Sequence, residues 1–217
     1  MLNLDLSKTR EQPLRLLFLG AHCDDIEIGC GGTVLRLARE FPDAVFHWVV
    51  FASDSERKQE AEASARAFLA GVADKQIVIE SFQESYFPYH GRAIKDFFEG
   101  AVKPIAPDLV FTHYRDDRHQ DHRIISDLAW NTFRDHMILE YEIVKYDGDF
   151  GTPNFFVPLA RDTSRRKVSL VLEHFPSQRG RQWFSADAFE AVARLRGIEC
   201  NAPDGHAEAY YARKLVF

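Results

Sequence analysis

The feature that most constrains the fold is an alternation of continuous apolar runs with segments of helical periodicity through the first 130 residues. Short apolar runs are typical of strands buried on both faces, and here they lie at 15–20, 44–52, 76–81 and 108–113. Helical patterns follow them at 31–41, 56–71, 93–105 and 122–135. Strands that alternate with helices pair in parallel through right-handed crossovers, with helices on both faces of the sheet. The sequence therefore predicts an α/β fold, a Rossmann-like three-layer sandwich with a mainly parallel sheet.

Beyond residue 136 the alternation is less regular. We predict two further strands, a loop and two helices, at 137–146 and 207–217, at 147–154, and at 161–175 and 185–197. Ser185 suits the N-cap of the second helix, and Gly197 suits its end. Because no repeat, low-complexity tract or linker interrupts the 217 residues, the chain is predicted to form a single domain over 1–217 with one full core.

The charge balance indicates which partners to expect. Charged residues make up 28% of the chain and the formal net charge is -6. Nucleic acids and anionic membranes require clustered positive charge, so this balance disfavours both as partners. No apolar run approaches the roughly 20 residues of a membrane helix. We expect a protein without an integral membrane segment that acts on a small molecule.

The N-terminus and the cysteines indicate the compartment. The segment MLNLDLSKTREQPLR carries acidic residues and lacks the apolar stretch of a secretory signal. Cys23, Cys30 and Cys200 are odd in number, widely separated and without CxxC spacing. They predict neither a disulfide framework nor an all-thiolate zinc site. The expected location is cytoplasmic.

Two polar segments directly follow predicted strands. Residues 21–32, AHCDDIEIGCGG, come after the first strand, and residues 115–123, RDDRHQDHR, come after the fourth. Open α/β sheets bind ligands at the carboxyl ends of their strands, where the strand order reverses. Each segment alone is a weak signal, because such residues more often form a turn, a helix N-cap or a solvated charge run. Their shared position after buried parallel strands indicates a functional site.

The residue types in these segments predict metal-assisted hydrolysis. Two histidines and a carboxylate in one cleft form a catalytic zinc set that leaves a fourth position for water, whose pKa zinc lowers toward about 7. Asp24 lies beside Asp25 and can take the proton of that water. His119 is placed to stabilise the developing oxyanion or to protonate the leaving amine, and Asp121 is placed to orient His119.

The first segment resembles the AHPDDxExGxGG signature of the PIG-L/LmbE family of zinc N-deacetylases, and residues 119–122, HQDH, resemble that family's HPDH motif. The resemblance implies a Rossmann-like fold, one divalent metal that is usually zinc, and assembly into trimers or hexamers. It implies hydrolysis of the acetamide of an N-acetylated amino sugar, releasing acetate and the free amine. Carried across by position, the resemblance implies that the metal ligands are His22, Asp25 and His122. It implies that Asp24 is the general base. It gives His119 the oxyanion or acid role, with Asp121 as its supporting carboxylate.

The resemblance extends to an arginine at the start of the second helix. Residues 57–61, RKQEA, are similar to an R-x-x-E-A pattern in which the family's arginine contacts the sugar, so Arg57 is the candidate for substrate binding. The alternative is an exposed helix residue that pairs with Glu60 at i,i+3, which is worth only a few tenths of a kcal/mol. The sequence leaves the two alternatives open.

The motifs depart from the family pattern at two prolines. Cys23 replaces the proline of HPDD, and Gln120 replaces the proline of HPDH. Neither position supplies a ligand in the family, but proline stiffens the backbone, so its loss is expected to loosen the ligand loops modestly. A thiolate beside the metal is also a potential ligand; residue alternation predicts instead that Cys23 points away from His22.

Two other function classes are carried as alternatives. A nucleotide-binding Rossmann protein is suggested by the glycines at 29–32 and by Asp54, which follows the second strand where a ribose-binding acid would sit. The glycine spacing departs from G-x-G-x-x-G, and this alternative leaves the HxDH segment unexplained. A non-catalytic metal-binding module is the other, although a purely structural site has no need of the spare carboxylate of Asp24. The sequence also leaves open whether the loop 147–154 or Glu208 contacts the substrate.

Overall fold

A computed structural model describes residues 12–215. The N-terminal residues on which the secretory-signal argument rests, 1–11, and the last two residues of the predicted closing strand lie outside the described part of the chain. Between residues 12 and 215, no helix is both long and apolar enough to cross a bilayer.

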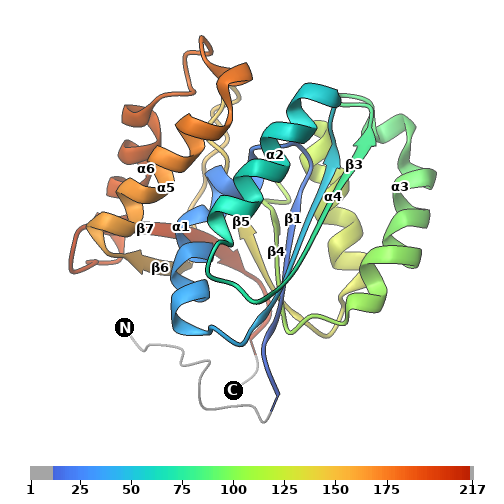
Figure 1. Cartoon of the computed structure of the whole chain (residues 1–217), viewed down its shortest axis with the longest axis horizontal. Coiled ribbons are helices and arrows are strands. Elements are labelled where there is room, and N and C mark those ends of the chain that lie inside the picture. The colour runs from blue at the N-terminus through green and yellow to red at the C-terminus, as the bar shows by residue number, and fades with distance from the viewer. Residues whose placement is uncertain (1–11, 216–217) are drawn as a thin grey trace.

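One seven-stranded sheet, in the order β3-β2-β1-β4-β5-β7-β6, runs through the described residues (Figure 1). Its strands are β1 (Arg15–Gly20), β2 (Val45–Ala52), β3 (Asp74–Phe82), β4 (Leu109–His113), β5 (Met137–Tyr141), β6 (Phe155–Leu159) and β7 (His206–Ala212). The first five strands pair in parallel. β7 is antiparallel to both β5 and β6. The predicted α/β fold with a mainly parallel sheet is confirmed, and an antiparallel extension is added at one side.

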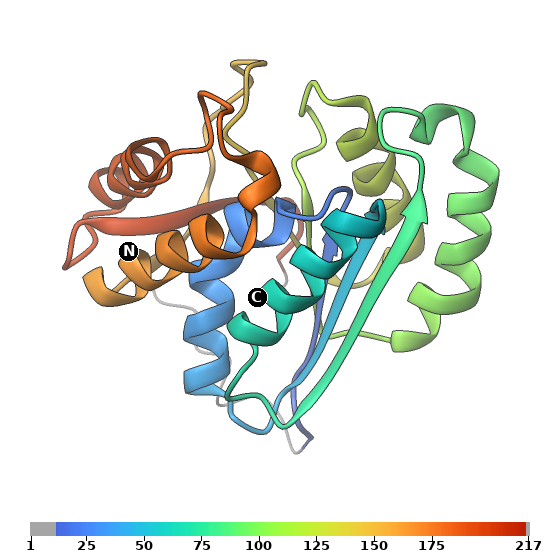
Figure 2. The ribbon, with the colours of Figure 1, turned by 45° about the horizontal axis from the view of Figure 1, so that its top comes forward.

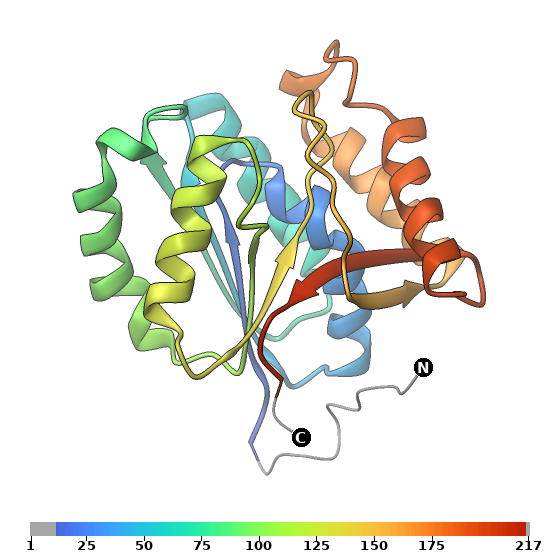
Figure 3. The same ribbon diagram turned by 180° about the vertical axis from the view of Figure 1, so that it is seen from behind.

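Helices cover both faces of the sheet. On one face lie α1 (Asp25–Glu40), α2 (Ser55–Phe68), α5 (Arg161–His174) and α6 (Ala186–Glu199). The other face carries α3 (Gly91–Phe97) and α4 (Gln120–Thr132), which stand in front of the sheet in Figure 3. Short helical turns complete the chain: η2 (Phe87–Tyr89), η3 (Phe98–Val102), η4 (Lys103–Ile105) and η5 (Pro176–Gln178).

The apolar core is divided into two layers because successive strand side chains point to opposite faces. Phe18 of β1 packs beside Trp48 of β2 in the layer under α1, α2, α5 and α6. Leu17 and Leu19 belong to the opposite layer, which also holds Phe51 and side chains of α3 and α4. Both layers exclude water from β1, which explains why its sequence is continuously apolar.

Several element boundaries differ from the predictions. α1 begins at Asp25 rather than near residue 31, and non-helical dihedrals at Cys30 divide it. α6 continues through Gly197, where a Cβ would clash with the backbone of Gly205. That glycine therefore permits close packing and does not end the helix. The strand predicted at 137–146 ends at Tyr141, and β6 was not predicted, because it is short, half-buried and contains a proline.

The reversal of strand order lies between β1 and β4. From β1 the chain proceeds through β2 to β3 on one side, and β4 and β5 extend the sheet on the other. β1 and β4 are direct parallel neighbours, so the two polar segments leave the same edge of the sheet. Figure 2 turns this end of the molecule forward. The two polar segments therefore face one another at the point where the strand order reverses.

Candidate active site

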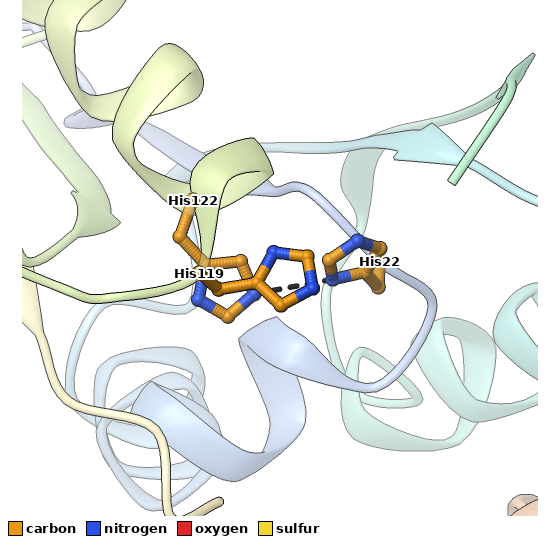
Figure 4. Close-up of side chains that lie close together, drawn as sticks. All are labelled: His22, His119 and His122. Atoms are coloured by element: carbon orange, nitrogen blue, oxygen red, sulfur yellow. Dashed lines mark hydrogen bonds between the residues drawn. The ribbon is translucent and has the colours of Figure 1, made fainter. Parts of the chain in front are cut away.

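The candidate site is built from the ends of β1 and β4 and the starts of α1 and α4. His22 lies in the short loop after β1, and Asp25 is the first residue of α1. His119 is the N-cap of α4, and His122 lies in its first turn. The rings of the three histidines converge on one point (Figure 4). His22, Asp25 and His122 are at least 94% buried, so the site is closed to bulk water at its base.

The predicted metal ligands present their donor atoms to one another. His22 Nδ1 lies 3.1 Å from His122 Nε2. Asp25 Oδ1 lies 3.4 Å from His122 Nε2, and Asp25 Oδ2 lies 3.4 Å from His22 Nδ1. Zinc–ligand bonds of about 2.0–2.2 Å in a tetrahedron place ligand atoms about 3.3 Å apart. The donor set therefore fits a zinc ion.

Two groupings of potential ligands occur among the described residues, and each contains His122 and one other member of the predicted set. One adds His22 and His119, and the other adds Asp25 and His113. His113 is fully buried, and its Nε2 accepts a hydrogen bond from the Ala21 backbone N–H at 2.9 Å. The lone pair that a metal would need is therefore engaged by the backbone. His113 escaped the sequence analysis because it is the last residue of the apolar strand β4.

Asp117 is a second residue that the sequence analysis did not single out. Its Oδ2 lies 2.9 Å from His122 Nδ1, and its Oδ1 accepts a hydrogen bond from the His119 backbone N–H at 2.7 Å. Burial raises the pKa of Asp117, but the hydrogen bond with His122 and the charge of Lys145 together lower it well below the ordinary value. An ionised Asp117 holds the proton of His122 on Nδ1 and leaves Nε2 free for a metal. The sequence signal that could have identified Asp117 is a carboxylate five residues before a candidate metal-ligating histidine.

The structure places the Asp121 carboxylate against His22, and no hydrogen bond joins it to the His119 side chain among the described residues. Asp121 Oδ2 lies 3.0 Å from His22 Nε2. The same carboxylate accepts hydrogen bonds from the backbone N–H groups of Ser85 and Phe87. His119 Nδ1 instead accepts from the Asp121 backbone N–H at 3.3 Å. Asp121 lies in the first turn of α4. From this position its side chain points toward His22 and toward the segment that follows β3.

Asp24 lies beside the donor set and is 96% buried. Its Oδ1 accepts a hydrogen bond from Arg57 Nη2 at 3.0 Å, and its Oδ2 has no hydrogen-bond partner among the described residues. Burial raises the pKa of Asp24, and the charge of Arg57 opposes that rise. One carboxylate oxygen is thus held by a cation while the other is available to accept a proton.

Arg57 is not the exposed helix residue of the alternative interpretation. Its side chain is only 11% exposed and binds Asp24 and Glu84. The Glu60 carboxylate accepts instead from the backbone N–H and hydroxyl of Ser177. The proposed i,i+3 pair is therefore absent. The structure brings Arg57 to the site through Asp24.

The thiols point away from the donor set. The Cys23 thiol is fully buried and donates a hydrogen bond to the Ala52 carbonyl at 3.3 Å. Burial raises the pKa of Cys23 and keeps the thiol protonated at neutral pH. Cys30 is likewise buried, within α1, and donates to the Ile26 carbonyl. The loss of the motif's proline therefore places no thiolate in the site.

The groups that suggested nucleotide binding make hydrogen bonds within the protein itself. The part of α1 beyond its break at Cys30 presents the N–H groups of Gly32 and Thr33, which donate to the Glu208 carboxylate at 2.8 and 2.6 Å. Glu208 thus stands where a phosphate would bind in a nucleotide-binding helix. Asp54 caps α2 by accepting hydrogen bonds from two backbone N–H groups. Glu208 therefore acts as a helix cap in this fold, and this structural role explains its position without a contact to substrate.

The histidines predict the pH dependence of the metal-free protein. Burial lowers the pKa of His22, but Asp25 and Asp121 outweigh it and raise the pKa to about 10. Burial, with the charge of His122, lowers the pKa of His113 to about 4. Above pH 6.5 the unfolded chain releases the His22 proton that the folded chain keeps, so the free energy of unfolding falls by about 1.4 kcal/mol per pH unit for one proton. Below pH 6.5 the unfolded chain binds a proton on His113, whereas the folded chain does not. The His113 contribution therefore lowers the free energy of unfolding as the pH decreases.

We therefore expect the metal-free protein to lose stability as the pH rises above 6.5, the ordinary histidine pKa, because the pKa values of both His22 and His122 are raised in the folded chain. Urea unfolding of chelator-treated protein between pH 4 and 9 measures this decline. Zinc-loaded protein is the control: a metal replaces the His22 proton, so the decline above pH 6.5 should disappear. A flat profile for the metal-free protein would contradict the charge assignment.

The fold is shared with solved structures of low sequence identity. N,N'-diacetylchitobiose deacetylase from Pyrococcus horikoshii is similar with a TM-score of 0.72 and 20% identity, over 96% of this chain and 87% of that one. A deacetylase of the teicoplanin biosynthetic pathway has a TM-score of 0.70 and 18% identity, over 91% and 97% of the two chains. The 4-carboxy-2-hydroxymuconate hydratase of Pseudomonas putida KT2440 has a TM-score of 0.69 and 15% identity, over 94% and 98%. A hydratase shares this fold, so the fold alone does not define the reaction.

The sequence itself matches one family model. That model, PIG-L, is described as GlcNAc-PI de-N-acetylase and matches residues 17–133. The match covers more than half of the 217 residues and includes both polar segments, most of β1 and all of β4. The resemblance drawn from the two motifs is confirmed: the chain belongs to the PIG-L family.

Proposed function

We propose that the protein is a zinc-dependent N-deacetylase that hydrolyses the acetamide of an N-acetylated amino sugar, releasing acetate and the free amine. The observation that carries the proposal is the Asp24 carboxylate. It is buried beside the donor set, and its Oδ2 is without a hydrogen-bond partner in the described chain. A structural metal site has no use for such an oxygen, whereas a hydrolase needs an acceptor for the proton of water.

His22, Asp25 and His122 would hold the metal. Zinc bound there lowers the pKa of a coordinated water toward about 7 and polarises a carbonyl oxygen. The protein prepares the set by hydrogen bonding: Asp117 engages the far nitrogen of His122, and Asp121 engages the far nitrogen of His22. Partners of this kind fix the ring orientation of ligand histidines.

Asp24 is the proposed general base. Arg57 binds its Oδ1, which orients the carboxylate and favours its ionised form against the burial that disfavours it. Oδ2 then accepts a proton from the attacking water as its oxygen bonds to the acetamide carbon. The same proton passes to the amine nitrogen when the C–N bond breaks, so the carboxylate is regenerated. Acetate and the amine together contain every atom of the acetamide and the water.

His119 is the proposed donor to the developing oxyanion. Its Nδ1 accepts from the Asp121 backbone N–H, so the neutral ring carries its proton on Nε2. Burial, followed by the charges of His122 and His22, lowers the pKa of His119 below the ordinary value. The ring is therefore neutral at pH 7 and acts as an Nε2–H hydrogen-bond donor. Of the two roles expected for His119, this arrangement supports stabilisation of the oxyanion and not protonation of the leaving amine.

The substrate class rests on the comparisons and on Arg57. The family description and the Pyrococcus horikoshii neighbour both name an N-acetylated glucosamine compound. Arg57, with Glu84 as its second partner, is the group we propose to meet the sugar next to the acetamide. Glu84 is 48% exposed at its side chain, so the pair reaches the solvent-facing rim of the site.

Acetate release from a panel of acetylated amino sugars tests the proposal. The panel contains N-acetylglucosamine, its β-linked disaccharide, a sugar nucleotide and an N-acetylated aminoglycoside. Zinc-loaded protein should release acetate and amine in equal amounts from at least one compound, and a chelator should abolish that release until zinc is restored. Zinc-loaded protein that releases acetate from none of them would favour the non-catalytic metal-binding module.

A further inference from the structure

Lys145 is a buried cation in the segment that follows β5. Its side chain is 10% exposed. Its Nζ lies 3.0 Å from Asp117 Oδ2, and it donates to Asp149 Oδ1 and Oδ2 at 2.6 and 2.5 Å. The ammonium group therefore lies between two carboxylates that come from different parts of the chain.

The first of these carboxylates is the one that contacts the candidate metal ligand. Asp117 Oδ2, which Lys145 contacts, is also the oxygen 2.9 Å from His122 Nδ1. Asp117 Oδ1 accepts from the backbone N–H of His119. A single carboxylate thus joins Lys145 to both catalytic histidines of α4.

The second carboxylate belongs to the loop 147–154, whose role the sequence left open. Asp149 has a side chain that is 8% exposed, and its Oδ2 also accepts from the Arg118 backbone N–H at 2.7 Å. Two residues later, the backbone N–H of Gly151 donates to Glu142. Asp149 holds the loop to the segment 115–123. Lys145 binds Asp149 and also contacts Asp117, the carboxylate beside His122.

The energetics favour a role for the bridge at the metal site. An acceptor on the far nitrogen orients a ligand histidine, and loss of such partners typically weakens metal binding 10- to 100-fold. Asp117 can serve as that acceptor only while its own position is fixed. A charge-assisted bond from a buried lysine fixes it, and removal of the lysine would leave two buried carboxylates without their shared cation.

We propose that Lys145 is a positioning residue of the metal centre, which holds Asp117 against His122 and so couples zinc affinity to the loop 147–154. The inference rests on the proposed function only in its assignment of His122 as a ligand. It does not depend on which substrate is hydrolysed.

The test is the zinc affinity of the full chain, measured by competition with a chromophoric chelator. Lys145→Met, which keeps the length of the side chain and removes its charge, should bind zinc about 10- to 100-fold more weakly. Lys145→Arg should restore the affinity to within about threefold, because it keeps the cation. Lys103→Met is the matched control, since Lys103 forms an exposed ion pair with Glu99 far from the site. Its affinity should equal that of the wild type.

The melting temperature of each metal-free variant separates positioning from folding. Without zinc, Lys145→Met should melt below the wild type, because two buried carboxylates lose their shared cation. When zinc is added, its melting temperature should rise by less than that of the wild type. If that variant does not fold, Asp149→Asn removes the other end of the bridge and should also weaken zinc binding. Wild-type zinc affinity in whichever of the two variants folds would overturn the proposal. Acetate release is measured separately: zinc binding that depends on Lys145 in a protein without deacetylase activity would refute the proposed function and leave this inference standing.

Discussion

Asp24→Asn is expected to lower kcat by a factor of about 10² to 10⁴ while zinc remains bound. The substitution keeps the shape of the side chain and its contact with Arg57 Nη2 through the remaining carbonyl oxygen. It removes the basic oxygen that has no other partner in the described structure. Proton transfer from water is then left to solvent, whereas metal binding does not involve this residue. Steady-state kinetics, together with the zinc content of the same preparation, measure both parts of the prediction.

Asp43→Asn is the matched control, because Asp43 is an exposed turn residue outside the site. It should leave kcat and zinc content at wild-type values. Unchanged turnover in Asp24→Asn would remove Asp24 as the base. Loss of zinc together with activity would instead mean that Asp24 contributes to the metal site.

His122→Ala is expected to reduce the zinc content from about one ion per chain to near zero and to abolish turnover. The imidazole supplies the donor atom shared by every potential metal group among the described residues. Its removal also leaves Asp25 and Asp117 without the ring that lies between them. Metal analysis of the purified variant measures the effect directly. His174→Ala, at the end of α5, serves as the control and should retain zinc.

Full metal occupancy in His122→Ala would show that the ligand set is wrong. A second pair of variants separates the remaining alternatives. His22→Ala should lose zinc, and His113→Ala should keep it, because His113 Nε2 accepts the Ala21 backbone N–H. The reverse result would assign the metal to Asp25, His113 and His122.

The fold and the core of the candidate site were predictable because both depend on local patterns. Apolar runs between helical segments define buried parallel strands, and β1 and β4 place the two motifs at one edge of the sheet. The segment after β1 then supplies, within four residues, the histidine and the two carboxylates that zinc-dependent hydrolysis needs. Element boundaries were predicted less well, since Gly197 permits a close approach that no local pattern reveals.

The partners of the site residues could not be predicted, because they come from segments distant in the chain. Asp121 was expected to serve its neighbour His119, yet its carboxylate reaches His22, 99 residues away. Arg57 was expected to contact the sugar or to pair with its helix neighbour, yet its side chain binds the proposed base and Glu84. Sequence separation contains no information about which side chain of a helical turn meets which loop.

By itself, the sequence determined the family, the mainly parallel sheet and the residue types gathered at its edge, since hydrophobic periodicity and motif spacing are properties of neighbouring residues. Only the tertiary structure decided which oxygen of Asp24 is free and which carboxylate supports each histidine. It also brought Lys145 to Asp117. These outcomes depend on burial and on contacts between distant segments, which are established only when the chain packs.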